Sequence, residues 1–128
     1  MDPQISSGTM KRRALVIDDD ELVRATIVSI LESVGYEVFE AEDGQQGLLL
    51  FHRHAVDLVI TDILMPSKEG IETIVEIRQR NREVRIVAVS GGGNIGSVSV
   101  LHAAQRLGAD AVLSKPFSKE ELLAKIAG

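Results

Sequence analysis

Short apolar runs alternate with segments of helical periodicity along almost the whole chain. Five runs have the length of buried strands, and they cover residues 14–17, 36–39, 58–61, 84–89 and 111–113. After each run, apolar residues recur at the three- and four-residue spacing of an amphipathic helix. The runs are apolar on both faces, as in parallel strands that helices cover on each side. The pattern therefore predicts an α/β fold of five strand–helix units in an open, doubly wound sheet.

Local signals mark the ends of several predicted helices. Asp43 has the position of a helix N-cap, and Ser118 begins the pattern of a capping box. Gly35 follows the first helical segment and is the residue type that most often ends a helix. The helical pattern of residues 94–107 is weak in its first half, which is poor in helix-forming residues.

Residues 1–12 do not follow this pattern, and we expect a disordered arm there, followed by one domain over residues 13–128. No apolar run approaches the length of a membrane span, and cysteine is absent, which excludes disulfides and thiolate metal sites. The net charge is −5 with scattered basic residues, which argues against a nucleic-acid or membrane partner. The composition fits a cytoplasmic globular protein.

Polar residues follow four of the five predicted strands. They are Asp18, Asp19 and Asp20 after the first, Asp62 after the third, Ser90 after the fourth and Lys115 after the fifth. Because the carboxyl ends of parallel strands lie along one edge of a sheet, we expect these side chains to converge in one crevice.

Several carboxylates in one crevice repel each other, and a divalent cation relieves that repulsion. Oxygen ligands without His or Cys favour Mg²⁺ over Zn²⁺, with Mn²⁺ as an alternative. The positive charge of Lys115 and the hydroxyl group of Ser90 suit an anion that arrives at the same place. The sequence therefore predicts a site for a metal ion together with a phosphate-like group.

Four short motifs in this order resemble those of the receiver domain of two-component response regulators. They are Leu15-Val16-Ile17-Asp18-Asp19-Asp20-Glu21, Asp62-Ile63-Leu64-Met65-Pro66, Val89-Ser90-Gly91 and Lys115-Pro116-Phe117. Each motif is weak alone, but together they are specific, and the resemblance extends from Arg13 to Ala127. It implies a flavodoxin-like, chemotaxis-regulator-like fold with strand order 2-1-3-4-5 and five helices.

The resemblance also implies which residues carry the chemistry. Asp62 would accept a phosphoryl group from the phosphohistidine of a histidine kinase or a histidine phosphotransfer protein. Asp19 and Asp62 would ligate Mg²⁺ directly, Asp18 would act mostly through water, and the backbone carbonyl of Leu64 would complete the protein ligands. The domain would not be an enzyme beyond promoting its own phosphorylation and dephosphorylation.

On the product side, the resemblance implies that Ser90 and Lys115 bind the new phosphoryl oxygens. It also implies a cis peptide bond between Lys115 and Pro116. Phosphorylation would then change the face formed by the fourth helix, the fifth strand and the fifth helix, to which a downstream effector protein binds. The protein would be a monomer or a dimer that forms on phosphorylation.

Three positions depart from what is common in the family. Val112 stands where many receivers have an aromatic residue that changes rotamer with the Ser or Thr. Leu64 and Gly92 stand where polar residues often tune hydrolysis of the phosphoryl group. Neither Leu64 nor Gly92 has a polar side chain that could orient water, and we therefore expect a long-lived phosphoryl group.

Other functions fit parts of the sequence. Ile17-Asp18-x-Asp20 also resembles the first motif of haloacid-dehalogenase-type phosphatases, with Asp18 as the nucleophile. That family needs a further acidic pair after its lysine, and here only Glu120 and Glu121 follow, in a predicted capped helix. A receiver-like interaction module that is never phosphorylated, or a fragment of a larger regulator, is also compatible with the sequence.

Overall fold

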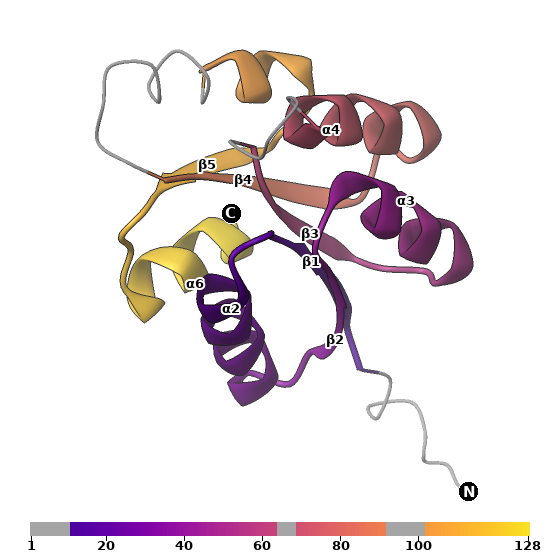
Figure 1. The fold of residues 1–128 in the computed structure, drawn as a ribbon. Coiled ribbons are helices and arrows are strands. Elements are labelled where there is room, and N and C mark those ends of the chain that lie inside the picture. The colour runs from indigo at the N-terminus through magenta and orange to yellow at the C-terminus, as the bar shows by residue number, and fades with distance from the viewer. Residues whose placement is uncertain (1–10, 64–68, 92–101) are drawn as a thin grey trace, which may run out of the picture.

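The computed structural model describes residues 11–63, 69–91 and 102–128 (Figure 1). Its centre is a parallel sheet of five strands in the order β2-β1-β3-β4-β5, which confirms the predicted order. The strands are β1 (Arg13–Ile17), β2 (Glu37–Ala41), β3 (Leu58–Asp62), β4 (Arg85–Ser90) and β5 (Ala111–Ser114). The predictions for residues 1–10, Leu64, Gly92 and the first half of residues 94–107 concern parts of the chain outside these ranges.

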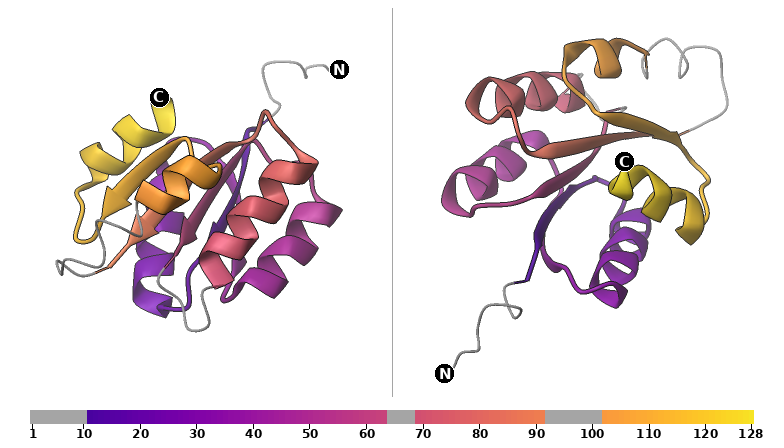
Figure 2. Two further views of the ribbon diagram at one scale, coloured as in Figure 1. Left: turned by 90° about the horizontal axis from the view of Figure 1, so that it is seen from above. Right: turned by 180° about the vertical axis from the view of Figure 1, so that it is seen from behind.

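Helices cover both faces of the sheet (Figure 2). They are α2 (Glu21–Ser33), α3 (Gly44–Arg53), α4 (Glu69–Arg80) and α6 (Lys119–Ala127), and residues 102–107 are also helical. Helices α2 and α6 lie side by side on one face, while α3, α4 and residues 102–107 lie on the other (Figures 1 and 2). None of the helices in the described ranges is long and apolar enough to span a membrane.

The sheet separates two apolar cores. Leu15 and Ile17 of β1 belong to the core beneath α3 and α4, whereas Ala14 and Val16 belong to the core beneath α2 and α6. All four side chains are fully buried, as expected for a strand with helices on both faces. Each fully buried Leu, Ile or Val contributes roughly 1.5–3 kcal/mol relative to an exposed one. The apolar runs thus fix where the strands lie.

Three of the local predictions are confirmed by hydrogen bonds and backbone angles. The Asp43 side chain accepts a hydrogen bond from the Gln46 N–H and caps α3, and Ser118 forms a full capping box at α6. Gly35 has a φ of 97° just after α2, in the left-handed region that favours glycine.

The predicted strand boundaries differ from the structure by one or two residues. Strand β2 was expected at residues 36–39, but the Tyr36 N–H donates to the Leu31 carbonyl and closes the end of α2 instead. Pairing with β1 therefore begins at Glu37 and continues to Ala41. Strands β3 and β4 extend one residue further than predicted and include Asp62 and Ser90 themselves.

Gly70, in the first turn of α4, lies against the end of β3. A Cβ atom at this position would collide with the backbone carbonyl oxygen of Asp62 and with the Cα of Ile63. Because these obstacles are main-chain atoms, the helix could accept a side chain here only by moving away from the strand. The absence of a side chain at Gly70 therefore lets α4 approach the residue that ends β3.

We predict that Gly70→Ala destabilises the protein by about 1–3 kcal/mol, the usual cost of overpacking. The sign of the stability change is informative, because replacing Gly by Ala in an unconstrained helix would stabilise the protein by up to about 1 kcal/mol. Urea unfolding of the variant measures the change in the free energy of unfolding. Glu72→Ala on an exposed position of the same helix is the control, and a Gly70→Ala variant as stable as the wild type would contradict the predicted clash.

Candidate functional site

Three carboxylates meet where β1 and β3 end. Strands β1 and β3 are neighbours in the sheet, so Asp18, which follows β1, lies near Asp62, the last residue of β3. Asp18, Asp19 and Asp62 each offer an oxygen atom, and these atoms lie within 4.8 Å of one another. Asp18 and Asp62 are buried and Asp19 is exposed. The structure therefore brings together three of the four acids that the sequence predicts at this edge, whereas the side chain of Asp20 caps α2.

These three residues fit a hard divalent cation. All the side-chain donors are carboxylate oxygens, which Mg²⁺ and Mn²⁺ prefer, and the residues offer neither imidazole nor thiolate. Mg²⁺ usually binds through one or two carboxylates and keeps several waters, and the exposed side of Asp19 leaves room for such waters. Leu64, whose carbonyl was predicted to be a further ligand, lies outside the described ranges.

Hydrogen bonds hold the turn that carries Asp18. The Asp18 N–H donates to the Ala41 carbonyl over 3.1 Å, and the Asp18 Oδ1 accepts from the Asp20 N–H over 2.8 Å. Asp20 in turn caps α2 by accepting from the Leu22 and Val23 N–H groups. The acidic run after β1 thus combines helix capping at Asp20 with a fixed orientation of the Asp18 carboxylate.

Arg24 supports the same turn and was not predicted from the sequence. Its Nη1 donates to the Asp18 carbonyl oxygen over 2.7 Å, and its Nε lies 3.2 Å from the Glu40 Oε1. The side chain is 15% exposed, so the guanidinium is largely shielded from water. The sequence contains no local signal for this contact, because it depends on how α2 folds back over the end of β1.

Lys115 provides a positive charge between two of the acids. Its Nζ lies 3.1 Å from the Asp18 Oδ2 and 3.3 Å from the Asp62 Oδ2. The Lys115 N–H donates to the Ser90 carbonyl over 2.8 Å, which fixes the main chain just after β5. The bond between Lys115 and Pro116 is cis, as the resemblance implied. Lys115, which was predicted to lie at the site, is therefore paired directly with two of its carboxylates.

Burial and the contact between Lys115 and the acids have opposite effects on the pKa values of Asp18 and Lys115. Burial raises the pKa of Asp18, and the charge of Asp62 raises it further, while the Asp20 N–H and Lys115 oppose the shift. For Lys115, burial alone would lower the pKa, but the charges of Asp62 and Asp18 outweigh it and raise the pKa. Lys115 therefore remains protonated at neutral pH and partly offsets the negative charge.

Ser90 ends β4 and is fully buried. Strand β4 lies between β3 and β5, so Ser90 follows Val89, which pairs with Asp62, and itself pairs with Ser114. Its Oγ donates to the Gly91 carbonyl over 3.4 Å, which is long for a hydrogen bond between oxygens. Ser90 thus ends the strand next to β3, and its hydroxyl group is only weakly held by this contact.

Val112 is partly buried and packs against the core beneath α3 and α4. The position that carries an aromatic residue in many receivers therefore contributes an aliphatic contact here. Gly92, the other departure on this side of the site, lies outside the described ranges.

Comparisons with known proteins identify the family to which this fold belongs. The family model of the response regulator receiver domain matches residues 14–127. The transcriptional regulatory protein CpxR of Klebsiella pneumoniae subsp. pneumoniae (strain HS11286) is 37% identical over 114 residues, which cover 89% of this chain and 47% of CpxR. The probable transcriptional regulator ycf27 of Guillardia theta is 37% identical over 116 residues, covering 91% of this chain and 44% of that protein.

Solved structures show the same relationship. A response regulator receiver domain protein (CheY-like) from Methanospirillum hungatei JF-1 has a TM-score of 0.80 and 30% identity over 92% of both chains. A response regulator protein from Burkholderia pseudomallei, with a phosphorylated aspartic acid, a calcium ion and citrate, has a TM-score of 0.79 and 28% identity over 89% of this chain and 65% of that one. The chain therefore belongs to the receiver-domain family of two-component response regulators, and it spans about half the length of the curated relatives it matches.

The phosphatase alternative finds no support in this geometry. Glu120 and Glu121 lie in the first turn of α6, and the Glu121 Oε1 accepts the Ser118 N–H over 2.8 Å in the capping box. The acidic residues after Lys115 thus serve a helix end.

The raised pKa of Asp18 gives a testable dependence of stability on pH. Folding favours the protonated form of Asp18, so its contribution to the free energy of unfolding is fully present below the ordinary pKa of 3.8. That contribution is lost as the pH rises through the raised pKa. We expect Asp18→Asn, which no longer titrates, to remove this fall in stability with rising pH in metal-free protein.

Urea unfolding in the presence of a chelator, repeated from acidic to neutral pH, measures this effect. Glu42→Gln replaces an exposed carboxylate and should keep the wild-type profile. If Asp18→Asn and the wild type change in parallel with pH, burial of Asp18 does not control this part of the profile.

Proposed function

We propose that this domain accepts a phosphoryl group on Asp62 and thereby switches the binding of a downstream protein. The observation that carries the proposal is the position of Lys115, whose Nζ contacts the Asp18 Oδ2 and the Asp62 Oδ2 at once. One cation thus links the acceptor carboxylate to the acids that would hold a metal. Charge around the transferring phosphoryl group is offset before the reaction begins, which is how catalysis of phosphoryl transfer mainly works.

The acids at the ends of β1 and β3 would hold Mg²⁺, or Mn²⁺ in its place. Asp19 and Asp62 would be direct ligands, Asp18 would act mostly through water, and the Leu64 carbonyl would complete the protein ligands. When bound, the metal neutralises charge on the phosphoryl oxygens. The close approach of the three carboxylates, within 4.8 Å, and the burial of Asp18 and Asp62 support this assignment.

The phosphoryl donor would be a phosphohistidine. A carboxylate oxygen of Asp62 attacks phosphorus, the P–N bond breaks, and its electron pair returns to the imidazole of the donor. Lys115 pairs with the phosphoryl oxygens, and the Ser90 hydroxyl, which is only weakly held, reorients to donate to one of them. These residues position and stabilise the group, and the product remains covalently bound to the domain.

The partners would be a histidine kinase or a histidine phosphotransfer protein on the donor side and an effector on the output side. CpxR and ycf27 are named as transcriptional regulators, and the Burkholderia pseudomallei protein contains a phosphorylated aspartic acid and a calcium ion. These names support a regulator in which the receiver governs another domain or protein, and the cytoplasm is the location that we propose for it. The surface that changes would include residues 102–107, β5 and α6.

We predict that incubation with acetyl phosphate and Mg²⁺ adds one phosphoryl group to the wild-type protein and none to Asp62→Asn. Asparagine is nearly isosteric with aspartate but lacks the nucleophilic carboxylate oxygen, so the site keeps its shape and loses its acceptor. Intact-mass spectrometry measures the adduct.

Two controls make this test specific. Asp57→Asn changes a carboxylate at the amino ends of the strands, where Asp57 accepts a hydrogen bond from the Arg13 N–H. This variant should still be phosphorylated. A chelator should prevent the adduct in the wild type. An unmodified wild type would favour an interaction module without phosphorylation, and release of phosphate from phosphomonoesters that depends on Asp18 alone would favour the phosphatase alternative.

We also predict slow loss of the phosphoryl group in isolated protein. Leu64 and Gly92 have no polar side chain to orient water, so hydrolysis should depend mainly on Asp62, Lys115 and the metal. Loss of the adduct followed by mass spectrometry should take minutes or longer, and Gly92→Glu should shorten it. Loss within seconds in the wild-type protein would contradict this expectation.

A further inference from the structure

Strand β5 places Lys115, and it is a short strand at the edge of the sheet. It has four residues, Ala111–Ser114, and pairs only with β4 among the described strands. Its last pair is Ser90 with Ser114, and the Lys115 N–H then donates to the Ser90 carbonyl. The position of Lys115 therefore depends on the register of β5 against β4. A slip of one residue would exchange the faces of the strand and move Lys115 away from the acids.

The opposite end of β5 is clamped to β4 by Asp110. Its main-chain N–H donates to the Ile86 carbonyl over 2.8 Å, and its side-chain Oδ2 accepts from the Ile86 N–H over 2.8 Å. Main chain and side chain of Asp110 thus hold both hydrogen-bonding groups of the same β4 residue. This pairing can form in one register only.

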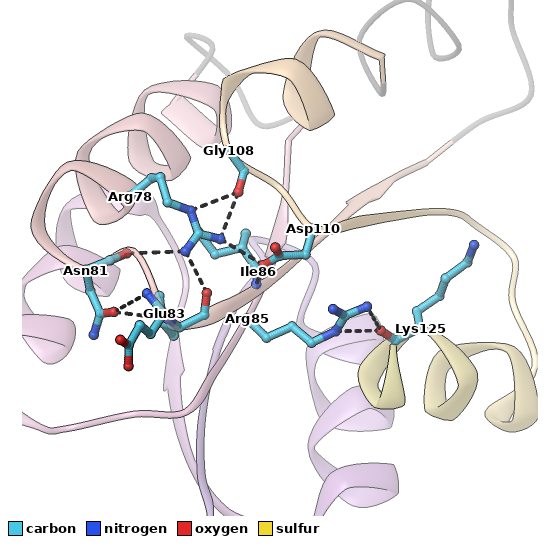
Figure 3. A network of polar contacts seen from close by, with 9 residues as sticks. Arg78, Asn81, Glu83, Arg85, Ile86, Gly108, Asp110 and Lys125 are labelled. Atoms are coloured by element: carbon cyan, nitrogen blue, oxygen red, sulfur yellow. Dashed lines mark hydrogen bonds and ion pairs between the residues drawn. The ribbon is translucent and has the colours of Figure 1, made fainter.

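Arg78 of α4 fixes Asp110 in turn (Figure 3). Its Nη2 donates to the same Asp110 Oδ2 over 2.8 Å, and its Nε and Nη2 donate to the Gly108 carbonyl over 3.1 and 2.8 Å. Its Nη1 donates to the Val84 carbonyl over 2.8 Å, immediately before β4. One guanidinium therefore ties the segment before β5 to the segment before β4.

Gly108 allows this close contact. It has a φ of 144°, and a Cβ atom there would lie 3.1 Å from the Cβ of Arg78 and 3.4 Å from the Cγ2 of Ile74. The chain thus passes close to α4 as soon as the helix of residues 102–107 ends. The Arg78 side chain is only 19% exposed there. The planar fork of arginine suits several main-chain carbonyls at once, and lysine cannot replace it in that respect.

We propose that Arg78 and Asp110 are positioning residues for phosphorylation, which hold β5 in register so that Lys115 reaches Asp18 and Asp62. This inference rests on the proposed function of Lys115. Asp110 lies five residues before Lys115, which corresponds to about 16 Å of extended chain. Neither Arg78 nor Asp110 belongs to the acceptor or the metal site. Such distance does not make the effect small, because a displacement of about 1 Å at a reacting group can cost about 100-fold in rate.

Arg85 provides a matched control at the same end of the sheet. Its Nε and Nη2 donate to the Lys125 carbonyl over 2.9 and 2.7 Å, so it holds the last turn of α6 (Figure 3). The side-chain hydrogen bonds of Asp110 are with Ile86 and Arg78 instead. Arg85→Gln removes the same kind of arginine-to-carbonyl contact as Arg78→Gln. It should reduce stability while leaving the register of β5 unchanged.

The test measures the rate of Asp62 phosphorylation by acetyl phosphate in Arg78→Gln, in the milder Asp110→Asn and in Arg85→Gln. We expect a decrease of about tenfold in Arg78→Gln, a smaller decrease in Asp110→Asn and the wild-type rate in Arg85→Gln. In a Lys115→Ala background, Arg78→Gln should cause no further decrease, because its effect passes through Lys115. Urea unfolding at the assay temperature shows whether each variant is folded under the conditions of the rate measurement.

A second readout does not depend on phosphorylation. The Lys115 side chain is 17% exposed and paired with two carboxylates, so it should be acetylated slowly by a lysine-directed reagent. Peptide mass spectrometry should find faster acetylation of Lys115 in Arg78→Gln and Asp110→Asn, but not in Arg85→Gln. If wild-type Asp62 is not phosphorylated, the proposed function fails, and this readout alone decides the positioning role.

The positioning role is overturned if folded Arg78→Gln keeps the wild-type rate and acetylation. It is also overturned if Arg85→Gln slows phosphorylation equally, or if the Arg78 and Lys115 effects are simply additive. If Arg78→Gln does not fold, the phosphorylation rate and the acetylation of Lys115 in Asp110→Asn decide between the same outcomes.

Discussion

The whole arrangement depends on keeping two buried carboxylates close together. Asp18 and Asp62 lie at the ends of neighbouring strands, and both are largely removed from water. Burial of unpaired charge is costly, and Lys115 is the cation that reaches both. Its position requires β5, which in turn requires α4 and β4 at the far end of the sheet. The pairing of Lys115 with Asp18 and Asp62 thus depends on the packing of β5, β4 and α4, which are distant in the sequence from β1.

The same balance explains why the site can respond to a ligand. Three carboxylates and one lysine leave net negative charge, and a divalent cation reduces it. The phosphoryl group proposed for Asp62 would add charge and strong acceptor oxygens beside Lys115, whose Nζ lies 3.3 Å from the Asp62 Oδ2. The hydrogen bond from the Ser90 hydroxyl to Gly91 is long, so the reorientation proposed for this hydroxyl would cost little.

Much of this could be predicted from sequence, because strand ends and apolar runs are local signals. Such signals predicted the caps at Asp43 and Ser118 and the convergence of Asp18, Asp19, Asp62 and Lys115. The strand order was predicted from the family resemblance. The supporting contacts of Arg24 and Arg78 were not. Each arginine reaches main-chain carbonyls that come close only after a helix has packed on the sheet, so no spacing in the sequence indicates them.

The two outer strands also affect how copies of this domain can associate. Strand β5 has only four residues, and β2 exposes Glu37 and Glu40, which pair with Arg13 and Arg24. Short or charged edge strands discourage a neighbouring molecule from extending the sheet, and such extension is a common route to aggregation. Association of two copies through their helices would avoid this route. The short β5 and the charged β2 thus disfavour continuous intermolecular sheets between copies of the domain.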